Sequence, residues 1–186
     1  QQAAVVGKEN VFDFSIGNPT VPAPACVKEA IEDIMETRES AAIHGYTAAA
    51  GDTAVRQGLA DFMNQTYDAQ VRADNFYMTC GAAASLTISL KALVESPDDE
   101  IILIAPFFPE YKPYVEGAGL NLKVVPPRTK DFQIDFDAFD AMLDENTAAV
   151  LINTPNNPSG AAYSAETLTG LADRLREVGG QAVLGR

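Results

Sequence analysis

The sequence is poor in the residues that most metal centres and hydrolytic triads require. It has one histidine, His44, and two cysteines, Cys26 and Cys80, which lack the spacing of a metal motif. Neither a zinc centre nor a serine–histidine–aspartate triad is therefore expected. Two free thiols indicate a reducing compartment, so we expect a cytoplasmic protein. We interpret His44 and Cys80 as structural, with His44 in a loop and Cys80 as a small buried residue.

Positive charge and long apolar runs are also scarce. The chain has 13 Lys and Arg against 26 Asp and Glu, a formal net charge of -13. Nucleic acids and anionic membranes attract a basic face, so neither is expected as a main partner. No apolar run reaches transmembrane length, and residues 1–10 lack the pattern of a signal peptide. Because the chain lacks an initiator methionine and stops just after a new apolar run, we interpret it as a piece of a longer protein.

The sequence does contain alternating strand and helix patterns, which are typical of an α/β protein with a parallel sheet and right-handed crossovers. Strands are predicted at 76–79, 101–105, 120–125, 147–152 and 181–184. Helices are predicted at 25–38, after Asp52, at 81–94 and 110–118, and after Asp135 and Ser164, these three residues acting as N-caps. The helix at 81–94 is apolar nearly all round and is expected to be deeply buried. The organisation changes near residues 40–46, so we expect an N-terminal arm and small-domain segment at 1–45 and the start of a large sheet domain at 46–186.

Small residues follow the predicted strand at 76–79, where a helix is expected to begin. Gly81, Ala82 and Ala83 would let backbone N–H groups approach a ligand, and a helix start adds partial positive charge, so the loop suits a phosphate. It has neither the lysine of a nucleotide P-loop nor the three glycines of a dinucleotide fingerprint. A closely packed helix start would use the same residues, so both interpretations stay open.

Two further strand ends carry loops that prolines hold in place. Two prolines flank Phe107-Phe108, and one of these rings could stack on a planar ligand while another fills the core. Within 154–160, Pro158 favours an extended Asn157 whose amide points outward, although an ordinary turn uses the same residue types. Ligands bind at the carboxyl ends of strands in open α/β sheets. The three loops together therefore predict a grip on a planar, phosphorylated, hydroxylated aromatic cofactor.

Five short motifs carry a resemblance to a known family. They are Ile16-Gly17-Asn18-Pro19, Tyr46-Thr47-Ala48-Ala49-Ala50-Gly51, Thr79-Cys80-Gly81-Ala82-Ala83, Pro106-Phe107-Phe108-Pro109-Glu110-Tyr111 and Asn156-Asn157-Pro158-Ser159-Gly160. In order and spacing the chain resembles the class I/II aminotransferases, which are pyridoxal 5′-phosphate (PLP) enzymes of fold type I. The resemblance implies a three-layer αβα large domain, truncated here, that follows an N-terminal arm and small-domain segment.

The resemblance also implies a role for each matching position. The cofactor phosphate would bind the backbone N–H groups of Gly81, Ala82 and Ala83. Phe108 would stack on the pyridine ring, where the family usually has Tyr or Trp, and Asn157 would hydrogen-bond the phenolic oxygen. Gly17, with Asn157, would line the substrate site. Tyr46 would reach the phosphate in the neighbouring subunit of a homodimer.

The implied activity is transfer of an α-amino group between an amino acid and a 2-oxo acid. The lysine that forms the Schiff base is expected beyond Arg186, so we expect no catalytic residue within this chain, no metal site, and no activity of these residues alone. The six lysines present are interpreted as solvated surface charges: Lys8, Lys28, Lys91, Lys112, Lys123 and Lys130. Two alternatives remain, a β-elimination lyase or cyclopropane-forming synthase of the same fold, and a non-catalytic truncated domain with a binding or regulatory role.

Overall fold

The structure, a computed structural model, describes residues 2–11, 21–178 and 181–185. It divides into two compact units, Gln1–Ala49 and Ala50–Arg186. The motif at 16–19, with Gly17, lies outside the described residues. Among the described residues, no helix combines the length and the apolar character needed to cross a bilayer.

The first unit contains short helices. Their bounds are α1 Gln2–Val6, the 3-10 helix η1 Lys8–Asn10, α2 Ala25–Thr37 and α3 Ser40–His44. Helix α2 confirms the predicted helix at 25–38. Its apolar stripe, Val27, Ile31, Ile34 and Met35, is 45–58% exposed. His44 was expected in a loop and is instead the last residue of α3, where its side chain is exposed.

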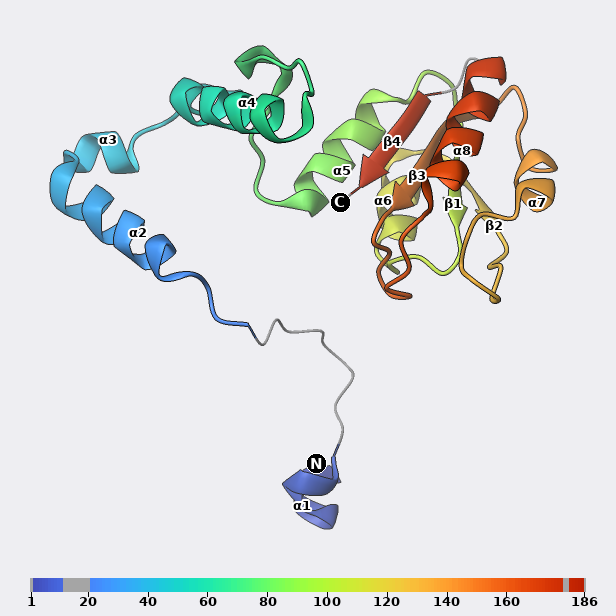
Figure 1. Ribbon diagram of the computed structural model, residues 1–186, viewed down its shortest axis with the longest axis horizontal. Coiled ribbons are helices and arrows are strands. Elements are labelled where there is room, and N and C mark those ends of the chain that lie inside the picture. Colours follow the sequence, from blue (N-terminus) through green and yellow to red (C-terminus); the bar gives the residue numbers. More distant parts are fainter. Residues whose placement is uncertain (1, 12–20, 179–180, 186) are drawn as a thin grey trace. The chain divides into compact units, whose positions relative to one another are not determined.

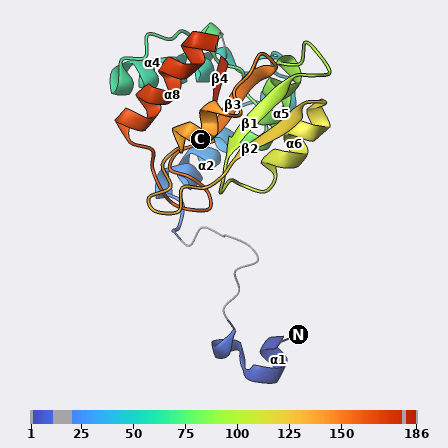
Figure 2. The same ribbon diagram turned by 90° about the vertical axis from the view of Figure 1, so that its right-hand side faces the viewer.

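The second unit is built on a parallel sheet. Its helices are α4 Thr53–Tyr67, η2 Ala73–Asn75, α5 Ala82–Ala92, α6 Tyr111–Ala118, α7 Phe136–Asp140 and α8 Ala165–Val178. Its strands are β1 Glu100–Ile104, β2 Asn121–Val125, β3 Thr147–Asn153 and β4 Gln181–Gly185. The strand order is β2-β1-β3-β4, and every neighbouring pair is parallel. Figure 1 and Figure 2 show helices on both faces of this sheet, which confirms the predicted three-layer α/β architecture.

Alternation along the central strands separates the core into two clusters. Ile101 and Leu103 of β1 face one cluster with α5 and α6, whereas Ile102 and Ile104 face another with α7 and α8. Successive side chains of a strand point to opposite faces, so a strand that is apolar on both faces must be covered on both. The apolar run at 101–105 therefore correctly predicted a strand of a parallel sheet.

Three predicted N-caps are confirmed. Asp52 accepts from the N–H groups of Ala54 and Val55 at 2.8 and 3.0 Å. Asp135 accepts from Ala138 at 3.2 Å, and the hydroxyl of Ser164 accepts from Thr167 at 3.1 Å. These oxygens bind N–H groups that have no partner inside their own helix.

Two predictions for the segment before β1 are wrong. Residues 76–79 do not form a strand, because no described strand lies beside them; their backbone N–H groups donate instead from Phe76 to Ala73 at 3.1 Å and from Met78 to Ala50 at 3.0 Å. Helix α5 is not buried all round: only Leu86 and Leu90 are buried, and Ile88 is 53% exposed. The apolar character of this helix exceeds what one contact face requires.

Helices α5 and α6, which pack on one face of the sheet, run in the same direction. Helix α5 leads through residues 93–99 to the start of β1, and Lys91 near its end donates to the carbonyl of Ala118 at the end of α6 at 3.1 Å. Both helices therefore end at the amino edge of the sheet. It follows that both begin at the carboxyl edge, where the strands end (Figure 1).

An ionic cluster occupies the amino edge. Lys123 of β2 pairs with Glu100 of β1 and with Asp144 at 2.6 Å, and also donates to the carbonyl of Met142 at 3.1 Å. Its side chain is 25% exposed, so the interpretation of Lys123 as a solvated surface charge is wrong. The hydrogen bonds that Lys123 donates to Asp144 and then to Glu100 raise the pKa of Lys123, and the bond that Asp144 accepts from Lys123 lowers the pKa of Asp144.

We predict that Lys123→Met lowers the free energy of unfolding by about 2 kcal/mol near pH 7, because the Glu100 side chain, only 17% exposed, is left largely buried without its cation. In the wild type, the Asp144 contribution is lost as the pH falls below 3.8, and the Lys123 contribution is lost as the pH rises above 10.5. Both limbs should flatten in the variant, as measured by urea unfolding across pH. The matched control, Lys112→Met, removes an exposed pair with Glu116 and should change stability by less than about 0.5 kcal/mol. Equal losses in the two variants would contradict the prediction.

Candidate functional site

The carboxyl edge of the sheet gathers the three loops that the sequence singled out. The loop 105–110 follows β1, the loop 154–164 follows β3, and Gly81 directly precedes α5, which begins at the same edge. A parallel sheet places its strand ends together, and this edge is the usual ligand position in open α/β folds. The structure thus brings two strand ends and one helix start to a common side.

Asn156 joins the loop after β3 to the loop after β1. Its side-chain amide donates to the carbonyl of Pro106 at 2.9 Å and to the hydroxyl of Ser159 at 2.8 Å. Its backbone also closes the turn, since its N–H donates to Ala161 at 2.8 Å and its carbonyl accepts from Gly160 at 2.7 Å. Sequence reasoning did not assign this role, because nothing in a turn-rich motif says which of two adjacent asparagines faces inward.

Asn157 is held by its backbone and leaves its side chain free. Its N–H donates to the side-chain oxygen of Asn153, the last residue of β3, at 2.7 Å. The side chain is exposed, and its amide has no hydrogen-bond partner among the described residues. Anchoring by β3 and by Asn156 therefore presents an unused carboxamide at the carboxyl edge.

Neither ring of the aromatic pair is fully buried or fully exposed. Phe107 and Phe108 are both partly buried and pack against the cluster beneath α5 and α6. Phe108 meets Tyr111 edge to face, with ring centroids 5.7 Å apart and planes at 73°. Tyr111 is buried, and this burial, followed by repulsion from Tyr114, raises its pKa. An edge-to-face neighbour fixes the plane of the Phe108 ring.

The start of α5 is an open array of backbone donors. Gly81 has φ 89° and ψ 173°, a conformation that residues with a side chain rarely adopt, and no side chain caps the helix. The N–H groups of Ala82, Ala83 and Ala84 have no acceptor among the described residues, whereas the other long helices of the unit that begin at Thr53 and Ala165 carry caps. Gly81, Ala82 and Ala83 are exposed, and an atom added at Gly81 would meet nothing within 4 Å.

This donor set fits the phosphate of PLP. Free N–H groups at a helix start, together with the helix dipole, attract an anion. Small side chains leave room for it. Among the described residues, no group of His, Cys, Asp and Glu is arranged to hold a metal ion.

Two further residues from the sequence motifs, Cys80 and Tyr46, are exposed. Cys80 was expected to be buried and is exposed; the strand expected at 76–79, just before it, does not form. Tyr46 belongs to the first unit, and its ring is fully exposed.

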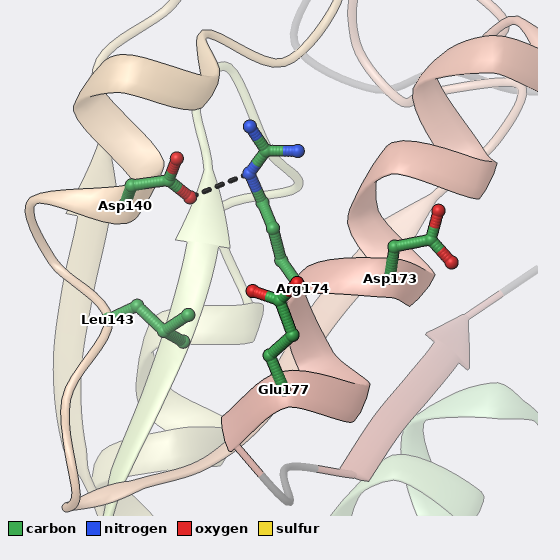
Figure 3. Close-up of a pocket in the computed structure, with 5 residues that line it drawn as sticks. All are labelled: Asp140, Leu143, Asp173, Arg174 and Glu177. Carbon is green, nitrogen blue, oxygen red and sulfur yellow. Dashed lines mark hydrogen bonds and ion pairs between the residues drawn. The ribbon is translucent and has the colours of Figure 1, made fainter.

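A separate cavity of about 420 Å³ lies between α7 and α8. Figure 3 shows its lining by Asp140, Leu143, Asp173, Arg174 and Glu177. Arg174 is already engaged: it pairs with Asp140 at 2.7 Å and lies 4.0 Å from the ring centre of Phe136. Three carboxylates around one committed cation make this cavity unsuited to a phosphate. Its residues lie on the later turns of α8, towards the amino edge, away from the three loops.

The comparisons with known proteins decide the family. Residues 9–183 match the family described as aminotransferase class I and II. The chain belongs to this family. It is 32% identical over 171 residues to an aspartate aminotransferase of Thermotoga maritima, covering 91% of this chain and 44% of that protein. It is 29% identical over 175 residues to an S-alkyl-thiohydroximate lyase of Arabidopsis thaliana, covering 92% of this chain and 37% of that one.

Solved structures agree with the sequence relatives. An aminotransferase from Eubacterium rectale superposes with a TM-score of 0.93 at 49% identity, covering 98% of this chain and 47% of that chain. An aspartate aminotransferase from Thermus thermophilus gives 0.83 at 27% identity, covering 91% and 43%. The resemblance to fold type I aminotransferases is confirmed, and the chain spans less than half the length of these relatives.

We predict that Asn156→Asp lowers the free energy of unfolding by about 1–3 kcal/mol, because a carboxylate cannot donate to the carbonyl of Pro106 and leaves it without a partner. Asn121→Asp is the matched control, since Asn121 makes the same amide-to-proline bond, to Pro97 at 3.1 Å, at the exposed amino edge. The control should change stability by less than about 0.5 kcal/mol. Urea unfolding measures both, and limited proteolysis of 154–160 should accelerate only in Asn156→Asp. Unchanged proteolysis in that variant would show that the bond does not hold the loop.

Proposed function

We propose that this chain is part of a PLP-dependent aminotransferase that moves an α-amino group between an amino acid and a 2-oxo acid. The observation that carries the proposal is the uncapped start of α5, whose first three N–H groups have no acceptor among the described residues. This helix start lies at the carboxyl edge of the sheet, in a chain that belongs to the aminotransferase family. Amino-acid metabolism is the corresponding process.

Each loop supplies one contact to the cofactor. The N–H groups at Gly81, Ala82 and Ala83 bind the phosphate and orient the whole group relative to the sheet. Phe108 covers one face of the ring and excludes water from it. Asn157 donates its free amide to the phenolic oxygen. Asn157 and, from the family resemblance, Gly17 are proposed to contact the substrate. Bound PLP supplies an electron sink for the bonds broken at the α-carbon.

The proton-transferring lysine is proposed to lie outside these 186 residues. Two of the lysines here are committed to the amino edge, Lys91 to a helix-end carbonyl and Lys123 to two carboxylates. Lys28 and Lys112 pair with glutamates one turn further along their own helices. A catalytic lysine must have a free amine beside the reacting carbon, and none of these four is so placed.

Assembly and compartment complete the proposal. Tyr46 has an exposed ring with no packing role in its own unit, which suits a residue that reaches the phosphate in a second subunit of a homodimer. The two thiols of the chain, Cys26 and Cys80, are both free and exposed, which suits a reducing compartment such as the cytoplasm.

A lyase remains the second candidate, because one relative at 29% identity carries that name. The two chemistries share the cofactor grip and separate after the α-proton leaves, so residues of this chain that bind the cofactor serve both. Product analysis distinguishes them: an aminotransferase yields a new amino acid and requires a 2-oxo acid, whereas a lyase yields a fragment without an acceptor.

The full-length protein should bind PLP, elute as a dimer and transfer amino groups from a panel of amino acids to 2-oxo acids. Borohydride reduction followed by peptide mapping should place the covalent adduct outside residues 1–186. An adduct on one of the six lysines of this chain would overturn the assignment of the catalytic amine. A PLP-free protein, or one fully active as a monomer, would contradict the cofactor or the shared site respectively.

Replacing Asn157 tests the grip on the ring. Asn157→Ala should leave the fold intact, since the side chain has no partner among the described residues. It should shift the pH titration of the absorbance of bound PLP by about one unit or more, because a hydrogen bond to a charged oxygen contributes about 1.5–3 kcal/mol. Asn121→Ala, at the opposite edge, should leave the titration in place. A folded Asn157→Ala protein with a wild-type spectrum at every pH would refute the contact.

A further inference from the structure

Two hydroxyl groups contact each other and the carbonyl of Gly81, at the start of α5. The hydroxyl of Thr79 lies 2.5 Å from that of Ser85 and donates to the carbonyl of Gly81 at 3.1 Å. The same carbonyl accepts from the N–H of Ser85 at 3.2 Å, and the Ser85 hydroxyl lies 3.5 Å from it. The contact between the hydroxyls is partly buried, whereas Gly81, Ala82 and Ala83 are exposed.

The direction of the hydroxyl bonds follows from counting protons. Each hydroxyl has one proton to donate. Thr79 is nearer to the carbonyl of Gly81 than Ser85 is, so Thr79 donates to the carbonyl and Ser85 donates to Thr79. Both side chains then depend on each other: without Ser85, Thr79 loses the bond that orients it, and without Thr79, Ser85 has only a long contact.

Holding this carbonyl also aims the adjacent N–H. A peptide bond is planar and trans, so the carbonyl of Gly81 and the N–H of Ala82 point in opposite directions. The two hydroxyls and the Ser85 N–H fix the carbonyl on the inner side of the turn. The Ala82 N–H is thereby directed outward, away from the helix, where the phosphate is proposed to bind.

The position needs such a constraint because it is a glycine. Gly81 has φ 89° and no side chain, and a Cβ built there would meet nothing within 4 Å, so packing does not hold this residue and its hydrogen bonds must. Glycine samples positive and negative φ with similar ease. If Gly81 were unrestrained, the Ala82 N–H could turn away from the phosphate position. The conformational entropy lost in ordering it would then weaken anion binding.

We propose that Thr79 and Ser85 are positioning residues for the phosphate site: their paired hydroxyls hold the Gly81–Ala82 peptide with its N–H facing the cofactor. The inference rests on the proposed function and adds two residues that touch neither cofactor nor substrate. It also explains why α5 has no side-chain cap, since a capping oxygen would occupy the N–H groups that the hydroxyls keep available from the other side.

The test measures PLP dissociation and the ³¹P chemical shift of bound PLP in the full-length protein. Thr79→Val and Ser85→Ala should each weaken PLP binding about tenfold, the loss expected when one hydrogen bond no longer orders the site, and should move the ³¹P signal. The double variant should be little weaker than either single variant, because the two hydroxyls act as one unit. Thr79→Ser keeps the hydroxyl and should retain wild-type binding.

The matched control is Thr37→Val in α2. The Thr37 hydroxyl makes the same kind of bond, to the carbonyl of Asp33 at 2.6 Å, and orients no peptide of α5, so its loss should leave affinity and ³¹P shift unchanged. Wild-type affinity and shift in folded Thr79→Val or Ser85→Ala would overturn the proposal, as would an equal loss in Thr37→Val. Should Thr79→Val not fold, Ser85→Ala and Thr79→Ser decide the outcome. Failure of the wild type to bind PLP would instead refute the proposed function.

Discussion

The parallel pairing of β1 with β2 and β3 is the constraint on which the second unit depends. A parallel neighbour can be reached only by a crossover that returns the chain to the starting edge. Each crossover here is a helix that begins where a strand ends, so loops and helix starts collect at one edge while helix ends collect at the other. The two edges then face different electrostatic conditions, because helix starts carry partial positive charge and helix ends partial negative charge.

At the amino edge, two lysines bind acceptor groups. Lys91 donates to the carbonyl at the end of α6, and Lys123 lies between Glu100 and Asp144. Cations are favourable where helices end, and both lysines lose most of their freedom there. At the carboxyl edge, the polar groups at the start of α5 are left unbound instead. Its first N–H groups have no acceptor among the described residues, and the residues that carry them are small and exposed. An edge with satisfied groups stabilises the sheet, and an edge with free donors can bind a ligand.

Sequence patterns predicted the sheet well because burial on both faces forces continuous apolar runs. The strands β1, β2, β3 and β4 lie within one or two residues of their predicted bounds, and Asp52, Asp135 and Ser164 cap helices as their chemistry suggests. Patterns failed where environment rather than composition decides. An apolar segment at 76–79 indicated a strand, yet a strand requires a neighbour, and none lies beside it in the described sheet. Lysine is usually a surface residue, but Lys123 forms ion pairs with Glu100 and Asp144, which come from distant segments of the chain.

For the candidate site, the sequence located the loops and missed what holds them. Gly81, Phe108 and Asn157 belong to motifs of recognisable composition, so their loops could be identified without coordinates. The bonds from Asn156 to Pro106 and from Ser85 to Thr79 join residues that share no pattern, one pair 50 positions apart and the other six positions apart. Composition specifies which groups are available, whereas their direction depends on hydrogen bonds from the side facing away from the ligand. Glycine restricts the backbone conformation of a loop only weakly. In such a loop, the hydrogen bonds on the side away from the ligand determine whether an N–H group points towards the ligand.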